Sequence, residues 1–354
     1  GQLYEPVDRD QVAYYREDKA GQILEEGINE AGAMADWIAA ATSYSTSDRI
    51  MIPFYIFYSM FGFQRVGDLC WAAGDMQSRG FLLGATSGRT TLNGEGLQHQ
   101  DGHSHLLSAT IPNCISYDPT FAHEVAVILH AGLKRMVEEQ DNVWYYVTLM
   151  NENYPHPGLK RGQEEGILKG MYLFKEGMAG SGKGLSIPRV QLLGSGTILR
   201  EVIAASDLLE RDWGVAGDVW SVTSFTELRR DGIDCERWNL LHPADKKPKK
   251  AYVTEKLERT AGPIVASTDY MRLFADQIRP YLPKGRAYHV LGTDGFGRSD
   301  TREKLREFFE VDRRFVTIAA LRALAEEGAL PMAKVAEAIK KYGIDPNKPN
   351  PTRA

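Results

Sequence analysis

The sequence is poor in cysteine, has no long apolar run and carries no excess of positive charge. Its three cysteines, Cys70, Cys114 and Cys235, are odd in number and far apart, so they give neither a disulfide framework nor a zinc-binding spacing. No run of 18 or more apolar residues is present, and no membrane-spanning segment is predicted. The net charge of -5 argues against a nucleic-acid partner, which would favour a basic surface. With no recognisable signal peptide, we expect a cytoplasmic protein without membrane or nucleic-acid partners.

What is present is the composition of a globular protein, with 43% hydrophobic and 25% charged residues among 354. Strand-like apolar runs alternate with helical patterns, which predicts largely parallel sheets flanked by helices. The predicted strands are residues 51–60, 80–85, 143–150, 190–194, 218–222, 264–267 and 287–292. The predicted helices are residues 26–41, 61–76, 119–139, 164–175, 198–209, 270–278, 302–309, 315–327 and 332–342. We therefore predict an α/β fold of two domains, with a mobile loop at 1–20, a first domain at 21–160, a linker at 161–188 and a second domain at 189–354.

A glycine-rich stretch, residues 90–105, concentrates proton-transfer groups. It contains His99, His103 and His105 together with Glu95 and Asp101. Imidazoles change charge near neutral pH, and glycines let the backbone approach a ligand. The His-x3-His spacing would also suit a metal on a helix, but the glycines argue against a helix there and no further ligand pattern accompanies it. We interpret the stretch as an active-site loop for proton transfer or anion binding.

Three other motifs have simpler interpretations. Residues 177–184 (GMAGSGKG) nearly match a phosphate-binding P-loop but lack its final Ser or Thr and follow a predicted helix instead of a strand, so we predict a connector. Asp294-Gly295 could be half of a magnesium–diphosphate motif, but the asparagine expected further along is absent and a tight turn is favoured. The basic run 246–250 (KKPKK) is short and isolated, which indicates a solvated loop.

Four longer strings point to a family. They are Ala40–Thr46 (AATSYST), Phe61–Asp68 (FGFQRVGD), Thr86–His99 (TSGRTTLNGEGLQH) and Gly292–Asp300 (GTDGFGRSD). They closely resemble the homodimeric pyruvate dehydrogenase decarboxylating component, a thiamine-diphosphate enzyme of bacterial multienzyme complexes. The resemblance covers essentially the whole chain but only the later part of the family's polypeptide. It implies that 21–160 is a thiamine pyrimidine-binding domain and 189–354 a transketolase C-terminal-like domain.

The family's upstream diphosphate-binding domain, which carries the Gly-Asp-Gly magnesium motif, is not in this sequence. We therefore expect this chain to be one piece of a cleaved or divided enzyme, with half of a site for thiamine diphosphate and no metal ligands of its own. The resemblance places the ligands of Mg²⁺ in the missing upstream domain.

The resemblance also implies roles for residues of the pyrimidine-binding domain. Glu30 matches the glutamate that hydrogen-bonds a ring nitrogen of the cofactor's aminopyrimidine and so activates it. Ile28 matches the bulky side chain that holds the two cofactor rings in a bent conformation. Phe61 matches the aromatic residue that stacks on the pyrimidine, and Tyr58 matches a hydroxyl that lines the reaction cavity. From pattern alone, Glu30 would be a surface helix residue and the aromatic run would be core.

Further roles are implied for the loops. His99 and Glu95 match an active-site pair, with His99 holding the substrate and transferring a proton and Glu95 either orienting His99 or contacting a bound intermediate. Asp8 matches a residue of a lid loop that orders over the cofactor. His103 and His105 remain open between a catalytic and a structural role.

The implied reaction is decarboxylation of pyruvate followed by reductive acetylation of a lipoyl group on the acyltransferase component, the step that links glycolysis to acetyl-CoA. The implied partners are the upstream diphosphate-binding half, a second protomer of a homodimer and the lipoyl acyltransferase. Two alternatives stay open: another thiamine-diphosphate enzyme of the 2-oxoglutarate dehydrogenase or transketolase type, and a non-catalytic subunit that keeps the fold.

Overall fold

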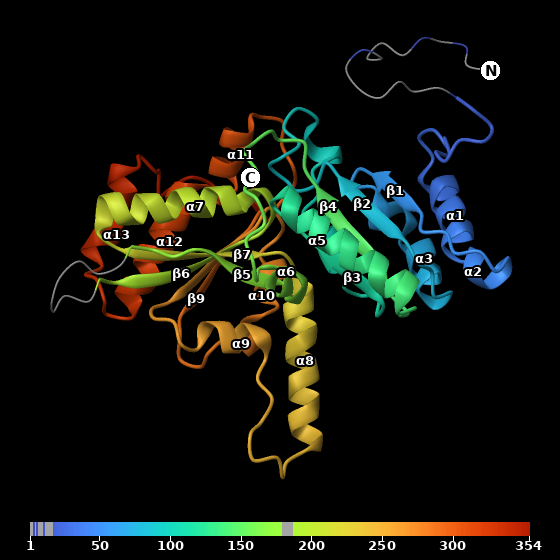
Figure 1. Cartoon of the computed structure of the whole chain (residues 1–354). Coiled ribbons are helices and arrows are strands. Elements are labelled where there is room, and N and C mark those ends of the chain that lie inside the picture. The colour runs from blue at the N-terminus through green and yellow to red at the C-terminus, as the bar shows by residue number, and fades with distance from the viewer. Residues whose placement is uncertain (1–2, 4, 6–9, 11–16, 179–186) are drawn as a thin grey trace.

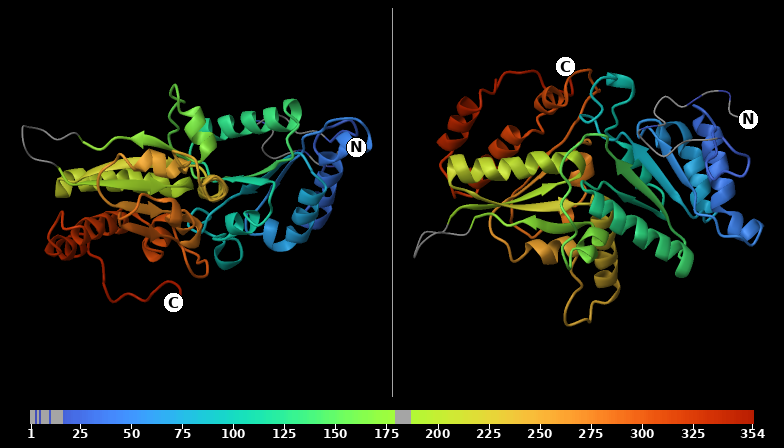
Figure 2. Two further views of the ribbon diagram at one scale, coloured as in Figure 1. Left: turned by 90° about the horizontal axis from the view of Figure 1, so that it is seen from below. Right: turned by 45° about the horizontal axis from the view of Figure 1, so that its top comes forward.

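The computed structural model consists of two α/β units side by side, shown from three directions in Figures 1 and 2. It describes all residues except 1–2, 4, 6–9, 11–16 and 179–186. Asp8, predicted to lie in a lid loop, and most of the P-loop-like segment 177–184 are outside the described residues.

The regular elements of the described residues follow the predicted alternation. The strands are β1 (Phe54–Phe57), β2 (Phe81–Ala85), β3 (Cys114–Tyr117), β4 (Trp144–Leu149), β5 (Met171–Lys175), β6 (Arg189–Gly194), β7 (Ala216–Val222), β8 (Ile264–Ser267) and β9 (Tyr288–Leu291). The helices are α1 (Glu30–Ala41), α2 (Ser43–Thr46), α3 (Gly62–Asp75), α4 (Ser104–Ser108), α5 (Ala122–Leu133), α6 (Glu164–Lys169), α7 (Leu199–Leu208), α8 (Phe225–Leu241), α9 (Tyr252–Leu257), α10 (Leu273–Asp276), α11 (Arg302–Phe308), α12 (Arg313–Glu326) and α13 (Ala333–Lys341).

Each unit is built on one sheet. The first sheet has the strand order β1-β2-β4-β3, and all its neighbouring strands are parallel. The second has the order β5-β7-β6-β8-β9, in which only the β5–β7 pair is antiparallel among the described strands. The predicted fold class, two largely parallel sheets flanked by helices, is confirmed.

The first sheet buries both faces, as the continuous apolar character of its central strand predicted. Along β4, Trp144 and Tyr146 belong to the core on the side of α1 and α3, whereas Tyr145 and Val147 belong to the core that contains Ile128 of α5. Because successive side chains of a strand alternate between faces, one run of large residues serves both cores.

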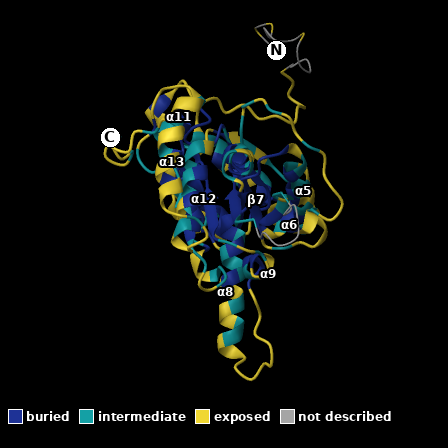
Figure 3. Ribbon diagram, turned by 90° about the vertical axis from the view of Figure 1, so that its left-hand side faces the viewer, coloured by how far each residue is buried: buried dark blue, intermediate teal, exposed yellow. Residues whose placement is uncertain are grey.

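The second sheet is also covered on both faces. Val190 and Leu192 of β6 pack in the core with α7, α12 and α13, and Leu193 packs in the core that contains residues of α8, α9 and α10. The far part of α8 extends away from this core, and its tip is exposed, with Leu240 78% accessible (Figure 3). The second domain therefore carries a protruding arm on the side away from α11 (Figure 1).

Several predicted elements differ from the structure. The helix predicted at 164–175 ends at Lys169, because Gly170 takes a left-handed φ of 105°, and Met171–Lys175 forms the edge strand β5. Two elements of the range predicted as linker are therefore regular structure, and β5 belongs to the second sheet. The helix predicted from residue 26 begins at Glu30, with Asn29 as its N-cap. The strand predicted at 51–60 is only β1, four residues long. α2, α4, α8, α9 and the strand β3 were not predicted.

Within the described residues, no helix has the length and apolarity needed to cross a membrane.

Candidate active site

Glu30 is the first residue of α1. The side chain of Asn29 caps this helix by accepting a hydrogen bond from the backbone N–H of Gly32 at 3.2 Å. The N-terminal end of a helix favours a negative charge, so the local structure suits a carboxylate. The Glu30 side chain is 18% exposed, and its Oε1 accepts a hydrogen bond from Arg65 Nη1 at 2.9 Å. No hydrogen bond to its second oxygen, Oε2, is present in the described part of the chain, which leaves one carboxylate oxygen free for a ligand.

Arg65 connects Glu30 to an aromatic cluster. It lies on α3, and packing of α1 against α3 brings it to Glu30. Its guanidinium carbon lies 3.9 Å from the centroid of the Phe61 ring, a cation–π contact. The pair therefore holds the predicted carboxylate and the predicted stacking residue next to each other.

The aromatic cluster contains three predicted site residues. Tyr58 and Phe61 follow β1 at its carboxyl end, the edge of a parallel sheet where ligand sites commonly lie. The ring centroid of His99 is 5.0 Å from that of Tyr58 and 4.9 Å from that of Phe61, both edge-on. Tyr58 and Phe61 are 6.1 Å apart. The structure therefore brings His99 next to Tyr58 and Phe61, which lie about 40 positions earlier in the sequence.

His99 also lies against Glu95. A short 3-10 helix, Gly96–Gln98, separates them, and Gly96 has a left-handed φ of 66°. His99 Nδ1 is 3.1 Å from Glu95 Oε2, close enough for an ion pair when the imidazole is protonated. The two groups are not aligned for a hydrogen bond, so the buried Nδ1 has no directed partner among the described residues. A polar atom in this state suits a ligand or a transferred proton.

His103 and His105 lie in different environments. His103 is partly exposed, and its Nε2 is 2.9 Å from Gln64 Oε1. His105 is fully buried at the junction of the domains, stacked on Phe274 of α10 with ring centroids 4.8 Å apart. Burial lowers the pKa of His105 to about 4, so it is neutral at pH 7, and its Nε2 contacts the Thr148 hydroxyl at 3.0 Å. His105 therefore packs the domain junction and does not face the Phe61 cluster.

The second domain holds the active-site loop in place. Asp269 is fully buried and accepts hydrogen bonds from the Thr90 backbone N–H at 3.0 Å and from the Thr91 hydroxyl at 3.1 Å. Burial raises the pKa of Asp269 to about 6. The buried Gln100 side chain donates to the carbonyl oxygens of Leu92 and Arg298 and accepts from the Arg298 N–H, each at 2.7 Å. These bonds fix the loop between the two domains.

Two predicted residues are not among those that the structure shows in this cluster. Ile28 is 98% exposed and lies just before α1. Asp8 lies outside the described residues. Among the described residues, no group of three or more His, Cys, Asp or Glu side chains could hold a metal ion.

Sequence reasoning missed Arg65. Nothing near Arg65 in the sequence marks it, because its partner Glu30 lies 35 residues away and the two meet only when α1 packs on α3. The string FGFQRVGD that contains it was noted for its resemblance, but the arginine was not assigned a role.

Two family models match successive parts of the chain. The pyruvate dehydrogenase E1 component middle domain matches residues 1–157, and the transketolase-like C-terminal domain matches residues 170–312. The pyruvate dehydrogenase E1 component of Cupriavidus necator is 66% identical over 351 residues, which cover 99% of this chain and 38% of that protein. That of Escherichia coli K12 is 61% identical over 355 residues, which cover 100% of this chain and 39% of that protein. The chain thus spans well under half the length of these relatives.

Solved structures show the same fold at low identity. Transketolase from Campylobacter jejuni aligns with a TM-score of 0.57 and 19% identity over 84% of this chain and 39% of that chain. A structure titled as a split gene transketolase, inactive beta4 tetramer, aligns with a TM-score of 0.57 and 17% identity over 84% of this chain and 83% of that chain. With two domain matches in the expected order and high identity along its whole length, the chain belongs to the pyruvate dehydrogenase E1 component family, of which it contains the middle and transketolase-like C-terminal domains.

Proposed function

We propose that this chain supplies the pyrimidine-side half of the active site of a thiamine-diphosphate-dependent pyruvate dehydrogenase (acetyl-transferring). The complete enzyme would decarboxylate pyruvate and reductively acetylate the lipoyl group of the acyltransferase component. One observation carries the proposal: a partly buried carboxylate, Glu30, starts a helix beside the cluster of Phe61, Tyr58 and His99.

The side chains present fit an aminopyrimidine ring. Glu30 keeps one carboxylate oxygen for a ring nitrogen while Arg65 holds the other. Phe61 and Tyr58 offer flat and edge surfaces for a heteroaromatic ring. We assign Ile28 to supporting the bend between the two cofactor rings, where contact with the cofactor would bury its exposed side chain. When bound, thiamine diphosphate supplies the nucleophilic carbon and the electron sink.

His99 and Glu95 are assigned to the substrate side of the site. His99 would hold the pyruvate carboxylate or oxygen and move a proton through its ring nitrogens, a role worth about 10²–10⁴ in rate where it applies. Glu95 would orient the imidazole through the 3.1 Å contact at Nδ1. Asp8 is assigned to a lid that closes over the site.

The remaining assignments concern what completes the enzyme. We propose a division near residues 161–188 between the two domains, a homodimer, a cytoplasmic location, and Mg²⁺ held by residues of an upstream diphosphate-binding half. The similar-length chain titled as an inactive split gene transketolase supports the view that a chain of this extent needs a complementary part.

The test uses the complete enzyme, in which this chain is combined with the part that its relatives have and it lacks. Glu30→Gln keeps the shape but removes the carboxylate, and we expect decarboxylation of pyruvate to fall at least about 10²-fold. Glu337→Gln on α13, a glutamate that also pairs with a cation (Lys334 Nζ at 2.8 Å), is the matched control and should retain activity.

Two results would redirect the proposal. Turnover of 2-oxoglutarate or sugar phosphates in preference to pyruvate would support another thiamine-diphosphate enzyme. Full activity of Glu30→Gln would support a non-catalytic role for this chain.

A further inference from the structure

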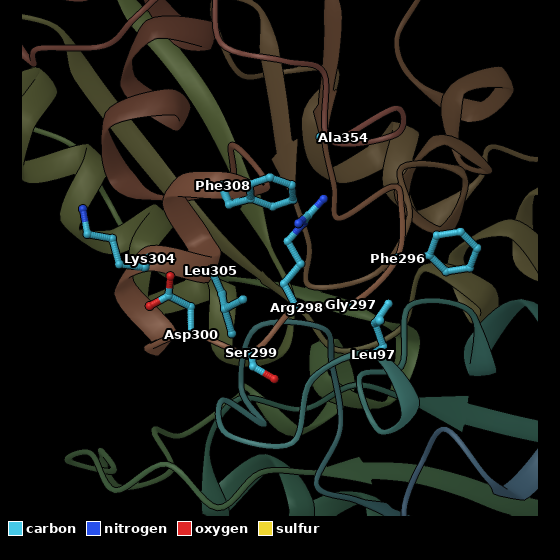
Figure 4. Close-up of a pocket in the computed structure, with 10 residues that line it drawn as sticks. All are labelled: Leu97, Phe296, Gly297, Arg298, Ser299, Asp300, Lys304, Leu305, Phe308 and Ala354. Atoms are coloured by element: carbon cyan, nitrogen blue, oxygen red, sulfur yellow. The ribbon is translucent and has the colours of Figure 1, made fainter.

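A groove beside the active-site loop is formed by both domains (Figure 4). Its cavity is about 670 Å³ in volume. The lining residues that matter here are Leu97, Phe296, Arg298, Asp300, Lys304 and Phe308. Leu97 belongs to the 3-10 helix that leads directly to His99, so the groove begins at the edge of the candidate active site.

One end of the groove is apolar and exposed. Phe296 is 82% accessible and Leu97 is 60% accessible, and both line the groove (Figure 4). A phenylalanine can bury about 150–250 Å² in a contact. Exposed apolar side chains gathered at one place, rimmed by polar groups, are typical of a protein interaction site.

The loop that carries Phe296 is held firmly against the active-site loop. Buried Gln100 exchanges two hydrogen bonds of 2.7 Å with the backbone of Arg298, two residues after Phe296. The Asp300 N–H donates to the Asn93 carbonyl at 3.3 Å. A surface that is already ordered loses little conformational entropy when it binds a partner.

The rest of the groove is charged. The charged side chains in its lining are Arg298, Lys304 and Asp300. Lys304 also pairs with Glu307 at 2.9 Å, whereas Arg298 forms no ion pair among the described residues and lies over the Phe308 ring at 4.5 Å. The groove therefore suits a partner that offers an apolar side chain next to an acidic one.

We propose that this groove docks the lipoyl-bearing domain of the acyltransferase component, with an apolar side chain of that domain on Phe296 and Leu97 and a carboxylate on Arg298. The inference rests on the proposed function, because only then must a group carried by another protein reach the loop of His99. Most of the groove's lining belongs to the second domain, to which the proposed chemistry gives no catalytic group.

The experiment compares two electron acceptors with the complete enzyme. Turnover of pyruvate with ferricyanide needs no protein partner, whereas reductive acetylation of an isolated lipoyl domain does. For Phe296→Asp we expect the KM for the lipoyl domain to rise at least about tenfold, as for loss of an aromatic anchor, with the ferricyanide rate within about twofold of the unsubstituted enzyme. Arg298→Glu should act in the same direction, and Phe296→Leu should restore most of the affinity.

Leu240→Asp, at a similarly exposed apolar residue on the α8 arm, is the matched control and should change neither rate. Equal behaviour of Phe296→Asp and Leu240→Asp would overturn the docking site. So would an equal fall of both rates in Phe296→Asp and in Arg298→Glu, because that indicates damage to the active site itself. Absence of ferricyanide turnover in the unsubstituted enzyme would instead refute the proposed function, and the docking site with it.

Discussion

Replacing Gln100 by alanine should loosen the active-site loop from the second domain. The Gln100 side chain is fully buried and makes three hydrogen bonds of 2.7 Å, two to Arg298 and one to Leu92. At about 1 kcal/mol each, the loss of the three bonds costs about 3 kcal/mol. With an unfolding entropy of about 2.1 cal/mol/K per residue, 1 kcal/mol corresponds to about 1.3 °C in a cooperative unit of 354 residues, so we expect the melting temperature to fall by about 4 °C.

The assay is a thermal melt followed by far-UV circular dichroism, combined with the rate of pyruvate decarboxylation by the complete enzyme, which should fall because His99 is on the loosened loop. Gln100→Glu keeps the side-chain volume but replaces the amide N–H₂ group, which donates to two carbonyl oxygens, with a carboxylate oxygen that cannot donate. This variant should also lower the melting temperature, and protonation of the carboxylate at acid pH should restore part of the loss. Gln163→Ala, which removes a local acceptor of the Lys160 N–H, is the control. A melting temperature within about 1 °C of the unsubstituted protein for Gln100→Ala would refute this account of the loop.

Two further predictions follow from the site and the domain junction. Arg65→Met should lower the rate of pyruvate decarboxylation about tenfold, because Glu30 loses its orienting hydrogen-bond donor and Phe61 loses its cation–π partner. The control Arg322→Met breaks an exposed ion pair on α12 and should leave the rate unchanged. Equal rates for the two variants would argue against Arg65 as a positioning residue. Burial raises the pKa of the Asp118 carboxyl to about 7, above the usual value of an aspartate. The folded state therefore binds the carboxyl proton more tightly than the unfolded state does. The stability that this proton contributes is lost as pH rises from about 4 to about 7. Asp118→Asn should flatten that part of the curve, and a constant difference in melting temperature from pH 4 to 8 would show that Asp118 does not titrate in this window.

The sequence predicted the fold where side-chain pattern decides the structure. β4 has apolar or aromatic residues at every position except Thr148, and it is buried on both faces in the structure. Prediction failed where the conformation of a single residue determines where an element ends. At Gly170 the positive φ ends α6, and the edge strand β5 begins at the next residue. It also failed for α8, because half of that helix is an exposed arm with no regular apolar face to reveal it.

The candidate site was predictable only in part. Glu30, Tyr58, Phe61, Glu95 and His99 were assigned by resemblance, and the structure gathers the last four with Arg65 connecting the first. Pattern alone could not do this, because it assigned the aromatic run to the core and Glu30 to the surface. Separating His99 from His105 required the fold, since both belong to one predicted loop but His105 lies in α4 and stacks on Phe274 of α10 in the second domain.

The most direct test of the central claim, that this chain holds the pyrimidine side of a shared cofactor site, is calorimetry of thiamine diphosphate with Mg²⁺. Titration into this chain combined with the missing part of its relatives should show tight binding that Glu30→Gln weakens, and titration into this chain alone should show none. Tight binding to this chain alone, or binding by the complete enzyme that is indifferent to Glu30→Gln, would contradict the account.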